Sequence, residues 1–237
     1  MLMVNHLVGF GAFSAAAGVG NDANTMFLLH CDGTDGSTTI TDSSTGGAES
    51  PHTQTAVADA QIDTAQSKFG GASLLFDGTG DRVTSPDSND YDFSGDFTVD
   101  FWMRPATVGT SVMIANCDAN NGSDGWHIAQ SGATGLLFAA MFSGGWGVYS
   151  SKTHSMSADT WYHIAIVRSG STITWYQDGT SIGTSSYGSA ITSSRALQLG
   201  ANPTTNTELY NGHLDEVRIS NIARWTANFT PPTSAYG

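Results

Sequence analysis

The chain has 237 residues, of which 39% are hydrophobic and only 12% are charged. Its formal net charge of −13, from 21 acidic residues against 8 Lys and Arg, argues against a nucleic-acid partner, because no basic patch is present to bind phosphates. No apolar run reaches the roughly 18 residues that a membrane-spanning helix requires. Cys31 and Cys117 allow at most one disulfide, and we expect two reduced, buried thiols.

Residues 1–24 differ in composition from the rest of the chain. No charge occurs before Asp22, and Gly, Ala, Phe and Leu dominate. Such a terminus would not fold alone, so we expect it either to dock on a neighbouring subunit or to cover its own domain. It lacks the positive start of a secretory signal and is expected to be retained. The sequence thus predicts an apolar arm for assembly, residues 1–24, and one main domain, residues 25–237.

Short runs of alternating polarity follow from Thr25 onward. Separated by Gly, Asp and Asn, they predict an all-β antiparallel sandwich or barrel. In the run Phe97–Met103, alternate residues starting at Phe97 share one face, which we expect to be core. The predicted strands are Met26–His30, Ala72–Phe76, Arg82–Thr84, Phe97–Arg104, Ser111–Asn116, Trp126–Gln130, Leu136–Phe142, Trp146–Ser150, Trp161–Arg168, Thr172–Gln177, Ala196–Gly200 and His213–Ile219.

Three connections between these strands are also predictable. The pair Asp178-Gly179 supplies the positive φ angles of a type I′ hairpin. The segment Gly33–Gln54 is rich in Ser, Thr, Gly and Asp, which is typical of a long excursion at one end of a sandwich. After the last predicted strand, the composition of Ser220–Arg224 permits a single helical turn, and Pro231-Pro232 then ends any regular structure.

Several motifs occur in a specific order along the chain. They are Lys68–Gly70, Phe76–Asp81, Phe97–Pro105, Trp161–Ala165, the Asp178-Gly179 hairpin and the closing Gly212–Ile219. In this order they resemble the LamG-like jelly-roll domains of the concanavalin A-like lectin/glucanase superfamily, from about Thr25 to the C-terminus. The resemblance implies an antiparallel β-sandwich (LamG/concanavalin A-like jelly roll) with a short N-terminal arm. It does not decide the function, because such domains serve as lectins, adhesion modules, enzyme accessories and virion parts.

The opening Leu7–Gly11 also resembles the start of some tailed-phage structural proteins. This resemblance implies a non-catalytic bacteriophage virion protein, either a capsid decoration or a tail fibre, which stabilises the particle or binds host-surface glycans. Its expected partners are other virion proteins, contacted through residues 1–24, and further copies of itself in a homo-oligomer. Assembly is then expected in the host cytoplasm. The alternatives are a free, extracellular, calcium-dependent lectin and, less favoured, a polysaccharide hydrolase or lyase.

The sequence gives little support to an enzyme. Glycoside hydrolysis needs two carboxyl groups roughly 5 to 9 Å apart, and the Glu-x-Asp-x-x-Glu strand of the superfamily's glucanases is absent. Asp215 and Glu216 are adjacent on a predicted strand, so their side chains are expected on opposite faces. The Gly-x-Ser-x-Gly match at Gly179–Gly183 lies in the hairpin rather than in a strand-to-helix turn. We therefore predict no catalytic residues.

Calcium is the one cofactor that the sequence suggests. The loop from Asp77 to Asp81 places two carboxylates close together, and hard cations prefer such oxygen ligands. The family resemblance implies a structural calcium shared between this loop and Asp215. The alternative is that Asp77 and Asp81 cap turns.

Sugar binding would need exposed aromatic rings beside polar side chains. The best candidates lie in the segments 120–126 and 144–149, whereas Trp102, Trp161 and Trp175 belong to framework strands and are expected to pack. For the tryptophans among the candidates, burial in the core is the favoured alternative. The candidate glycan-binding residues are Asn120, Asp124, Trp126, Trp146 and Tyr149.

Overall fold

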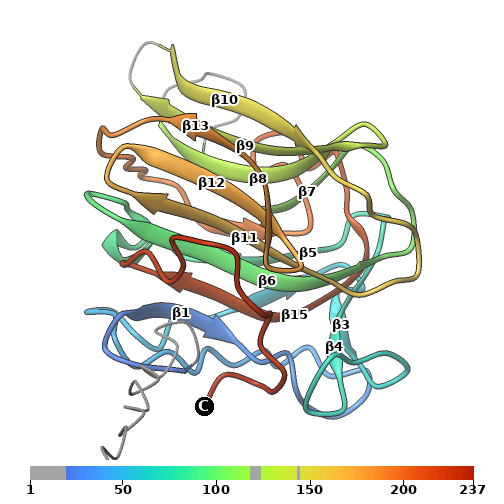
Figure 1. Cartoon of the computed structure of the whole chain (residues 1–237). Helices are drawn as coiled ribbons and strands as arrows, with labels where there is room; N and C mark the ends of the chain where they lie inside the picture. Colours follow the sequence, from blue (N-terminus) through green and yellow to red (C-terminus); the bar gives the residue numbers. More distant parts are fainter. Residues whose placement is uncertain (1–19, 118–123, 143–144) are drawn as a thin grey trace, which may run out of the picture.

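The computed structural model describes residues 20–117, 124–142 and 145–237, which form two antiparallel sheets packed face to face (Figure 1). The eight-stranded sheet has the order β13-β12-β11-β6-β15-β4-β3, with β1 also paired to β15, and the seven-stranded sheet has the order β10-β9-β8-β7-β14-β5-β2. The predicted all-β sandwich is therefore confirmed. The elements are β1 (Thr25–Leu29), β2 (Thr55–Val57), β3 (Gln61–Asp63), β4 (Ser73–Asp77), β5 (Arg82–Ser85), the 3-10 helix η1 (Asn89–Tyr91), β6 (Phe97–Pro105), β7 (Ser111–Cys117), β8 (Gly125–Ser131), β9 (Gly135–Phe142), β10 (Gly145–Thr153), β11 (Tyr162–Ser169), β12 (Thr172–Gln177), β13 (Thr180–Ser186), β14 (Leu197–Leu199) and β15 (Asn211–Ser220).

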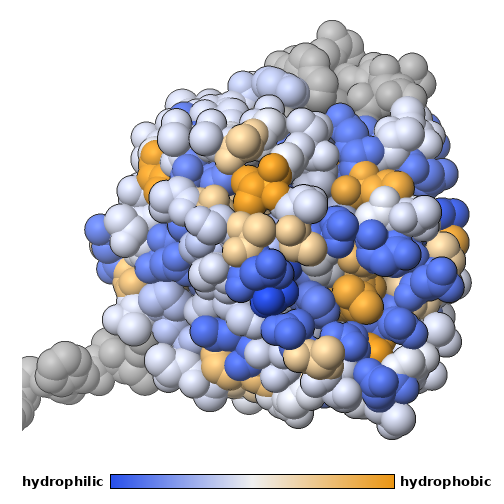
Figure 2. Space-filling view, turned by 90° about the vertical axis from the view of Figure 1, so that its right-hand side faces the viewer, coloured by the Kyte–Doolittle hydropathy of each residue, from blue (hydrophilic) through white to orange (hydrophobic). Residues whose placement is uncertain are grey.

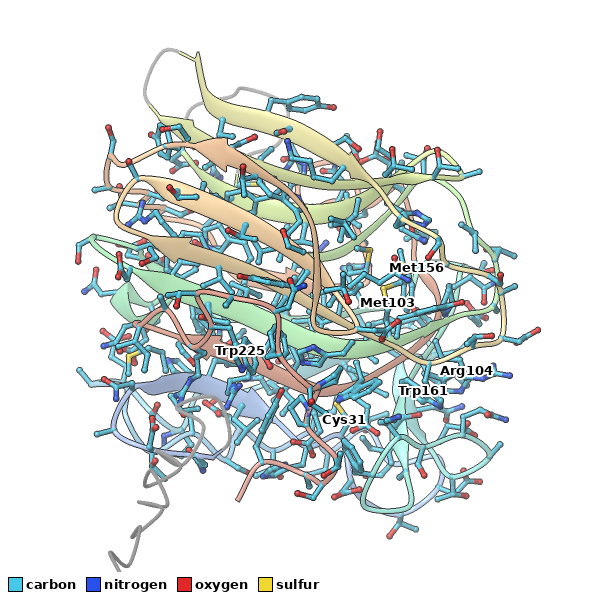
Figure 3. All side chains as sticks on the ribbon, viewed as in Figure 1. Cys31, Met103, Arg104, Met156, Trp161 and Trp225 are labelled. Atoms are coloured by element: carbon cyan, nitrogen blue, oxygen red, sulfur yellow. The ribbon has the colours of Figure 1, made fainter. Side chains whose placement is uncertain are left out.

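The hydrophobic core lies between the two sheets. On β6, the predicted core face is correct, because Phe97, Val99, Phe101 and Met103 are all buried in one cluster with residues from the opposite sheet. Each fully buried side chain of this size contributes about 1.5–3 kcal/mol to folding. Met103 and Met156, both labelled in Figure 3, belong to this core.

The connections are partly as predicted. Asp178 and Gly179 have φ angles of 49° and 74°, which confirms the hairpin between β12 and β13. The helical turn permitted at Ser220–Arg224 does not form, because Ser220 is the last residue of β15, paired with both β1 and β6, and residues 221–224 contain bends but no helical structure. The backbone N–H of Arg224 then donates to Thr98 Oγ1 across the end of the strand. The short strands β2 and β3 were not predicted.

The described part of the chain contains little helix. Its one helical element, η1, spans 3 residues, so nothing in the described ranges has the length and apolarity of a membrane-crossing helix. Cys31 and Cys117 are both buried in separate apolar clusters and are not joined in a disulfide, as expected. The surface shown in Figure 2 carries its hydrophobic residues in separate small groups among polar ones.

The C-terminal segment, residues 221–237, covers the outer face of the eight-stranded sheet. The rings of Trp225 and Phe229 stack with their centroids 4.0 Å apart, over a small apolar cluster that includes Val167 and Tyr176 (Trp225 is labelled in Figure 3). Tyr236 is buried beside β6 and β15, where its hydroxyl donates to Asp100. This segment therefore closes one outer face of the sandwich.

The first described residues belong to the domain rather than to an arm. Asn21 donates its backbone N–H to the carbonyl of Gly237 at 2.6 Å, and Asp22 forms an ion pair with Arg224 at 2.8 Å. Asn21 and Asp22 are thus tied to the C-terminal segment and the sheet edge, while the division into an arm and a domain stays a prediction. The remainder of the predicted arm, residues 1–19, lies outside the described residues.

Candidate functional site

The outer face of the seven-stranded sheet carries one row of residues in register across six strands. Their sequence neighbours on each side, such as Trp126 and Phe138, point into the core, so this row points away from it. Strand pairing makes each residue the direct neighbour of the next. The row runs Tyr149 (β10), Ala139 (β9), His127 (β8), Ala115 (β7), Gln198 (β14) and Thr84 (β5).

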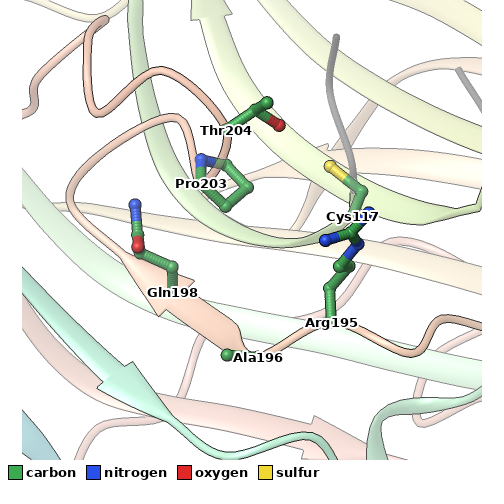
Figure 4. A pocket seen from close by; sticks show the side chains of 6 residues that line it. All are labelled: Cys117, Arg195, Ala196, Gln198, Pro203 and Thr204. Atoms are coloured by element: carbon green, nitrogen blue, oxygen red, sulfur yellow. The ribbon is translucent and has the colours of Figure 1, made fainter. Parts of the chain in front are cut away.

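A pocket with a volume of about 330 Å³ lies on this face over β7 and β14. Gln198 reaches it because Leu197 and Leu199, on either side in β14, both point into the core. Figure 4 shows Cys117 and Arg195 on one side of the pocket and Gln198 and Pro203 on the other. The described lining residues are Cys117, Arg195, Ala196, Gln198, Pro203 and Thr204.

The wall of the pocket that contains Pro203 and Thr204 is a polar loop closed by its own hydrogen bonds. Asn202 donates its backbone N–H to the carbonyl of Thr207 and its side-chain amide to Glu208 Oε2, both at 2.9 Å. The loop is fixed to the sheet by the backbone N–H of Val112, which donates to the Glu208 carbonyl at 2.8 Å. These hydrogen bonds hold the loop, and with it the rim of the pocket, in place.

The imidazole of His127 lies beside the floor of the pocket. Burial lowers the pKa of His127 to about 4, so its imidazole is neutral near pH 7. His127 Nδ1 lies 3.8 Å from the Cys117 sulfur. None of the described residues lining the pocket is Asp or Glu, so the pocket presents a guanidinium, an amide and a hydroxyl, from Arg195, Gln198 and Thr204. These groups can hydrogen-bond a polar ligand but offer no acid–base pair.

The predicted glycan-binding residues differ in whether they reach the surface. Tyr149 is 59% exposed on the same face as the pocket, and four strand spacings place it roughly 19 Å from Gln198. Trp126 is fully buried against Phe93, and its indole N–H donates to the Tyr91 carbonyl, so the favoured alternative of burial in the core is confirmed for it and it is not a surface glycan contact. The other three candidates stand as follows: Asp124 is half-buried and accepts from Ser194, the side chain of Trp146 is not described, and Asn120 lies outside the described residues.

The three predicted calcium ligands do not converge on one point. Asp81 is buried, and its carboxylate accepts from the backbone N–H groups of Asp59 and Asp77, each at 2.7 Å. Asp77 Oδ1 accepts from Thr79 in the turn. Asp77 is paired with Asn211, so Asp215 lies four residues further along β15, roughly 13 Å away.

These contacts decide the fit of the shared calcium site. No group of three His, Cys, Asp or Glu side chains within the described ranges is arranged to hold a metal ion. The carboxylates of Asp77 and Asp81 accept backbone N–H groups at turns, which is the alternative that the sequence left open. Asp215 instead accepts from the backbone N–H groups of Lys68 and Phe69. The described residues therefore do not fit the shared calcium that the family resemblance implies, and calcium binding by other means stays a prediction.

Asp215 and Glu216 also depart from the expected alternation. A β-bulge after Asp215 gives Glu216 a φ of 50°, and the strict two-residue period is lost there. Asp215 Oδ2 accepts from the backbone N–H groups of Lys68 and Phe69, whereas Glu216 pairs with His30 at 2.8 Å and accepts from the backbone N–H of Tyr236. Both carboxylates hold neighbouring chain segments on the sheet.

Sequence reasoning missed the residues that shape the pocket. Gln198 had a signal, because it is the polar residue between Leu197 and Leu199 in a predicted strand. Arg195 had a weaker one, as one of only 8 Lys and Arg in an acidic chain. Thr204 had none, because the folding of the loop back over β14 is a tertiary property.

Comparisons with known proteins agree with this architecture. A family model described as the concanavalin A-like lectin/glucanases superfamily matches residues 77–228, whereas no curated protein matches by sequence. The receptor-binding domain of botulinum neurotoxin type G has a TM-score of 0.62 at 16% identity over 84% of this chain and 48% of that one. Domain 4 of AbnA, a GH43 extracellular arabinanase from Geobacillus stearothermophilus in complex with arabinotriose, has a TM-score of 0.60 at 18% identity over 84% of this chain and 93% of that one.

A botulinum neurotoxin type C structure also matches, with a TM-score of 0.59 at 13% identity over 84% of this chain and 48% of that one. The present chain thus spans about half the length of the two toxin chains. At these identities the similarity shows a shared fold.

Proposed function

The chain belongs to the concanavalin A-like lectin/glucanase superfamily, and from this premise we propose that it is a non-catalytic module that binds glycans. The observation that carries the proposal is the pocket on the outer face of the seven-stranded sheet. Arg195, Gln198 and Thr204 present hydrogen-bonding groups there, and no carboxylate is among its described lining residues. A sugar ring offers several hydroxyl groups to such a site, and hydrolysis by the usual mechanism would require two carboxyl groups.

The structural neighbours support a glycan as the ligand. The GH43 arabinanase domain was solved with arabinotriose, and cell entry of botulinum neurotoxin type C is described as dependent on two ganglioside molecules. Both are proteins in which this fold accompanies recognition of carbohydrate. In the present chain, exposed Tyr149 on the same face adds an aromatic ring that can stack on a sugar, so we propose a ligand of several sugar units.

A glycan array followed by calorimetric titration tests this function. We expect binding to at least one glycan class, and we expect Arg195→Gln to weaken it about tenfold, which corresponds to about 1.4 kcal/mol. Thr204→Ala should weaken it less, because a neutral hydrogen bond contributes about 1 kcal/mol. Matched controls are Thr205→Ala, in the same loop but outside the pocket lining, and Arg104→Gln, on the other sheet.

Two results would contradict glycan binding at this pocket, and a third would contradict the absence of catalysis. One is the absence of binding to any glycan at millimolar concentration by the folded protein. The other is binding that Arg195→Gln and Arg104→Gln reduce equally, since this would place the ligand elsewhere. Release of reducing sugar from a bound polysaccharide would contradict the non-catalytic part of the proposal.

We further propose that this module is a virion component attached to other virion proteins through its N-terminal segment. Support comes from the sequence, in which residues 1–19 carry no charge and resemble the start of some tailed-phage proteins. A chain that lacks residues 1–19 keeps the Asp22–Arg224 ion pair and should fold, but should not join particles. Mass spectrometry of purified particles provides the measurement, and attachment of the shortened chain would contradict this role.

A further inference from the structure

A second hollow lies on the opposite side of the sandwich, at the edge of the C-terminal segment. It has a volume of about 380 Å³, and four of its seven lining residues are apolar. We call it the proline groove. Its lining residues are Lys68, Phe69, Trp102, Thr230, Pro231, Pro232 and Thr233.

The proline groove has a defined floor and one cation. Trp102 is buried on the outer face of β6, and the ring of Phe69 meets it edge-on with centroids 5.9 Å apart. The Lys68 ammonium lies 3.7 Å from the Trp102 ring centre, and burial lowers its pKa. Asp215 fixes this arrangement from below, because it accepts from the backbone N–H groups of Lys68 and Phe69.

The groove lies close to where the N-terminal segment joins the domain. The C-terminal segment leaves the groove at Thr233 and ends at Gly237, a span of at most about 14 Å of extended chain. There the carbonyl of Gly237 accepts from Asn21, and Arg218 donates to the carbonyl of Gly20 at 3.1 Å. The 19 residues that precede Gly20 can therefore reach the groove, because an extended chain of that length spans up to roughly 60 Å.

The composition of residues 1–19 suits the proline groove. They include no charged side chain, so none has to be desolvated on docking. Their backbone carbonyls can accept from the Lys68 ammonium. Because the segment is tethered to the same domain, its effective concentration at its own groove reaches the millimolar range. Its large apolar side chains are Met1, Leu2, Met3, Val4, Leu7, Val8, Phe10, Phe13 and Val19.

We propose that the proline groove is the docking site for residues 1–19 of the same chain. The groove then holds the segment against the domain until an assembly partner displaces it. This placement is independent of the glycan pocket, which lies on the opposite sheet.

The full chain provides a direct test, because Lys68 and Lys152 are its only lysines. The rate of acylation by a small amine reagent is measured for each lysine by mass spectrometry, and Lys152 serves as the internal reference. We expect Phe10→Asp with Phe13→Asp to raise the Lys68 rate several-fold while the Lys152 rate stays unchanged. The matched control Ser14→Asp adds a charge at a polar position of the segment and should have little effect.

The dependence on protein concentration identifies the occupant. Docking within one chain is intramolecular, so it does not depend on protein concentration. We therefore expect the Lys68 acylation rate, relative to Lys152, to be about the same at roughly 1 and roughly 100 µM protein. Protection that increases with concentration would overturn the proposal by assigning the groove to a second copy. Equal Lys68 rates in the full chain and the Phe10/Phe13 variant would overturn it as well. Circular dichroism on each variant confirms that the sandwich is folded.

Discussion

The two outer faces of the sandwich differ in how they are completed. The outer face of the eight-stranded sheet carries charged side chains that are fully buried, because residues 221–237 cover them. Asp100 accepts from Arg218 Nε at 3.0 Å and from Tyr236 and lies 3.4 Å from His163, so four side chains share one network. Burial raises the pKa of Asp100, but Arg218 and His163 outweigh this effect and hold that pKa below its ordinary value.

The outer face of the seven-stranded sheet is built from smaller groups. Ala115, Ala139 and the neutral His127 occupy its central row, and a loop of Asn and Thr bounds its pocket. No comparable ion pair crosses this row within the described residues. On one face, charged side chains are buried and paired beneath the C-terminal segment, whereas the polar groups of the other face line the pocket for which we propose a glycan.

The largest expected effect comes from breaking the network on the covered face. Asp100→Ala leaves the Arg218 guanidinium buried without its carboxylate, and loss of one partner of a buried pair costs about 3–5 kcal/mol. Urea unfolding at pH 7 measures the change in the free energy of unfolding. Gln198→Ala on the other face is the matched control and should cost no more than about 1 kcal/mol. Equal losses in the two variants would remove the distinction between the faces.

A second effect on the covered face depends on pH. Burial raises the pKa of Asp215 to about 7, so the folded protein binds more protons than the unfolded chain between about pH 4 and pH 7. The stability of the natural protein should therefore fall as pH rises through this window. In Asp215→Asn the amide oxygen can still accept from Lys68 and Phe69, but no buried charge forms.

We thus expect Asp215→Asn to be more stable than the natural protein at pH 8, by on the order of 2 kcal/mol, with the difference shrinking toward pH 4. Thermal and urea unfolding across this range provide the measurement. Asp77→Asn, at an exposed carboxylate on β4, is the control for the loss of one acidic charge. A difference that grows as the pH falls would have the wrong sign for a raised pKa.

The sequence predicts the sandwich well because its signals are local. Alternation along β6 identifies the core face without any partner, and Asp178-Gly179 specifies its own hairpin. The composition of Ser220–Arg224 permits a helical turn, but none forms, because Ser220 is paired with β1 and β6 as the last residue of the strand. Strand pairing outweighs such a weak local preference.

The candidate site is less predictable because it is assembled across the sheet. Tyr149 and Trp126 were both candidates for an exposed aromatic ring. Tyr149 is exposed, whereas Trp126 is buried, which was the favoured alternative for the tryptophans. Nothing local distinguishes the two residues, since burial depends on which side of each strand faces the other sheet. The pocket also needs Thr204 beside Cys117, and their proximity exists only after folding.

A smaller effect tests how far a ligand extends over the outer face of the seven-stranded sheet. If the glycan spans from the pocket to Tyr149, Tyr149→Ala should weaken binding of long oligosaccharides about fivefold, which is about 1 kcal/mol, because one stacking contact is lost. Binding of a disaccharide should not change, since roughly 19 Å separates the ring from Gln198. Titration with a length series of one glycan measures this. Equal weakening for both lengths would indicate that Tyr149 contacts the pocket ligand directly.

The smallest effect concerns the edge of the covered face, where Asp22 pairs with Arg224. The hydrogen bond from Arg224 lowers the pKa of Asp22 to about 2, so its stabilising contribution is present above about pH 4 and lost as pH falls toward 2. The Asp22 side chain is 48% exposed, and solvent screening limits the effect of Asp22→Asn to about 0.5 kcal/mol at pH 7. Urea unfolding at low and high salt measures it, with Asp96→Asn as an exposed control. A loss of several kcal/mol would mean that the C-terminal segment depends on this ion pair, rather than on the burial of Trp225 and Tyr236, to stay on the sheet.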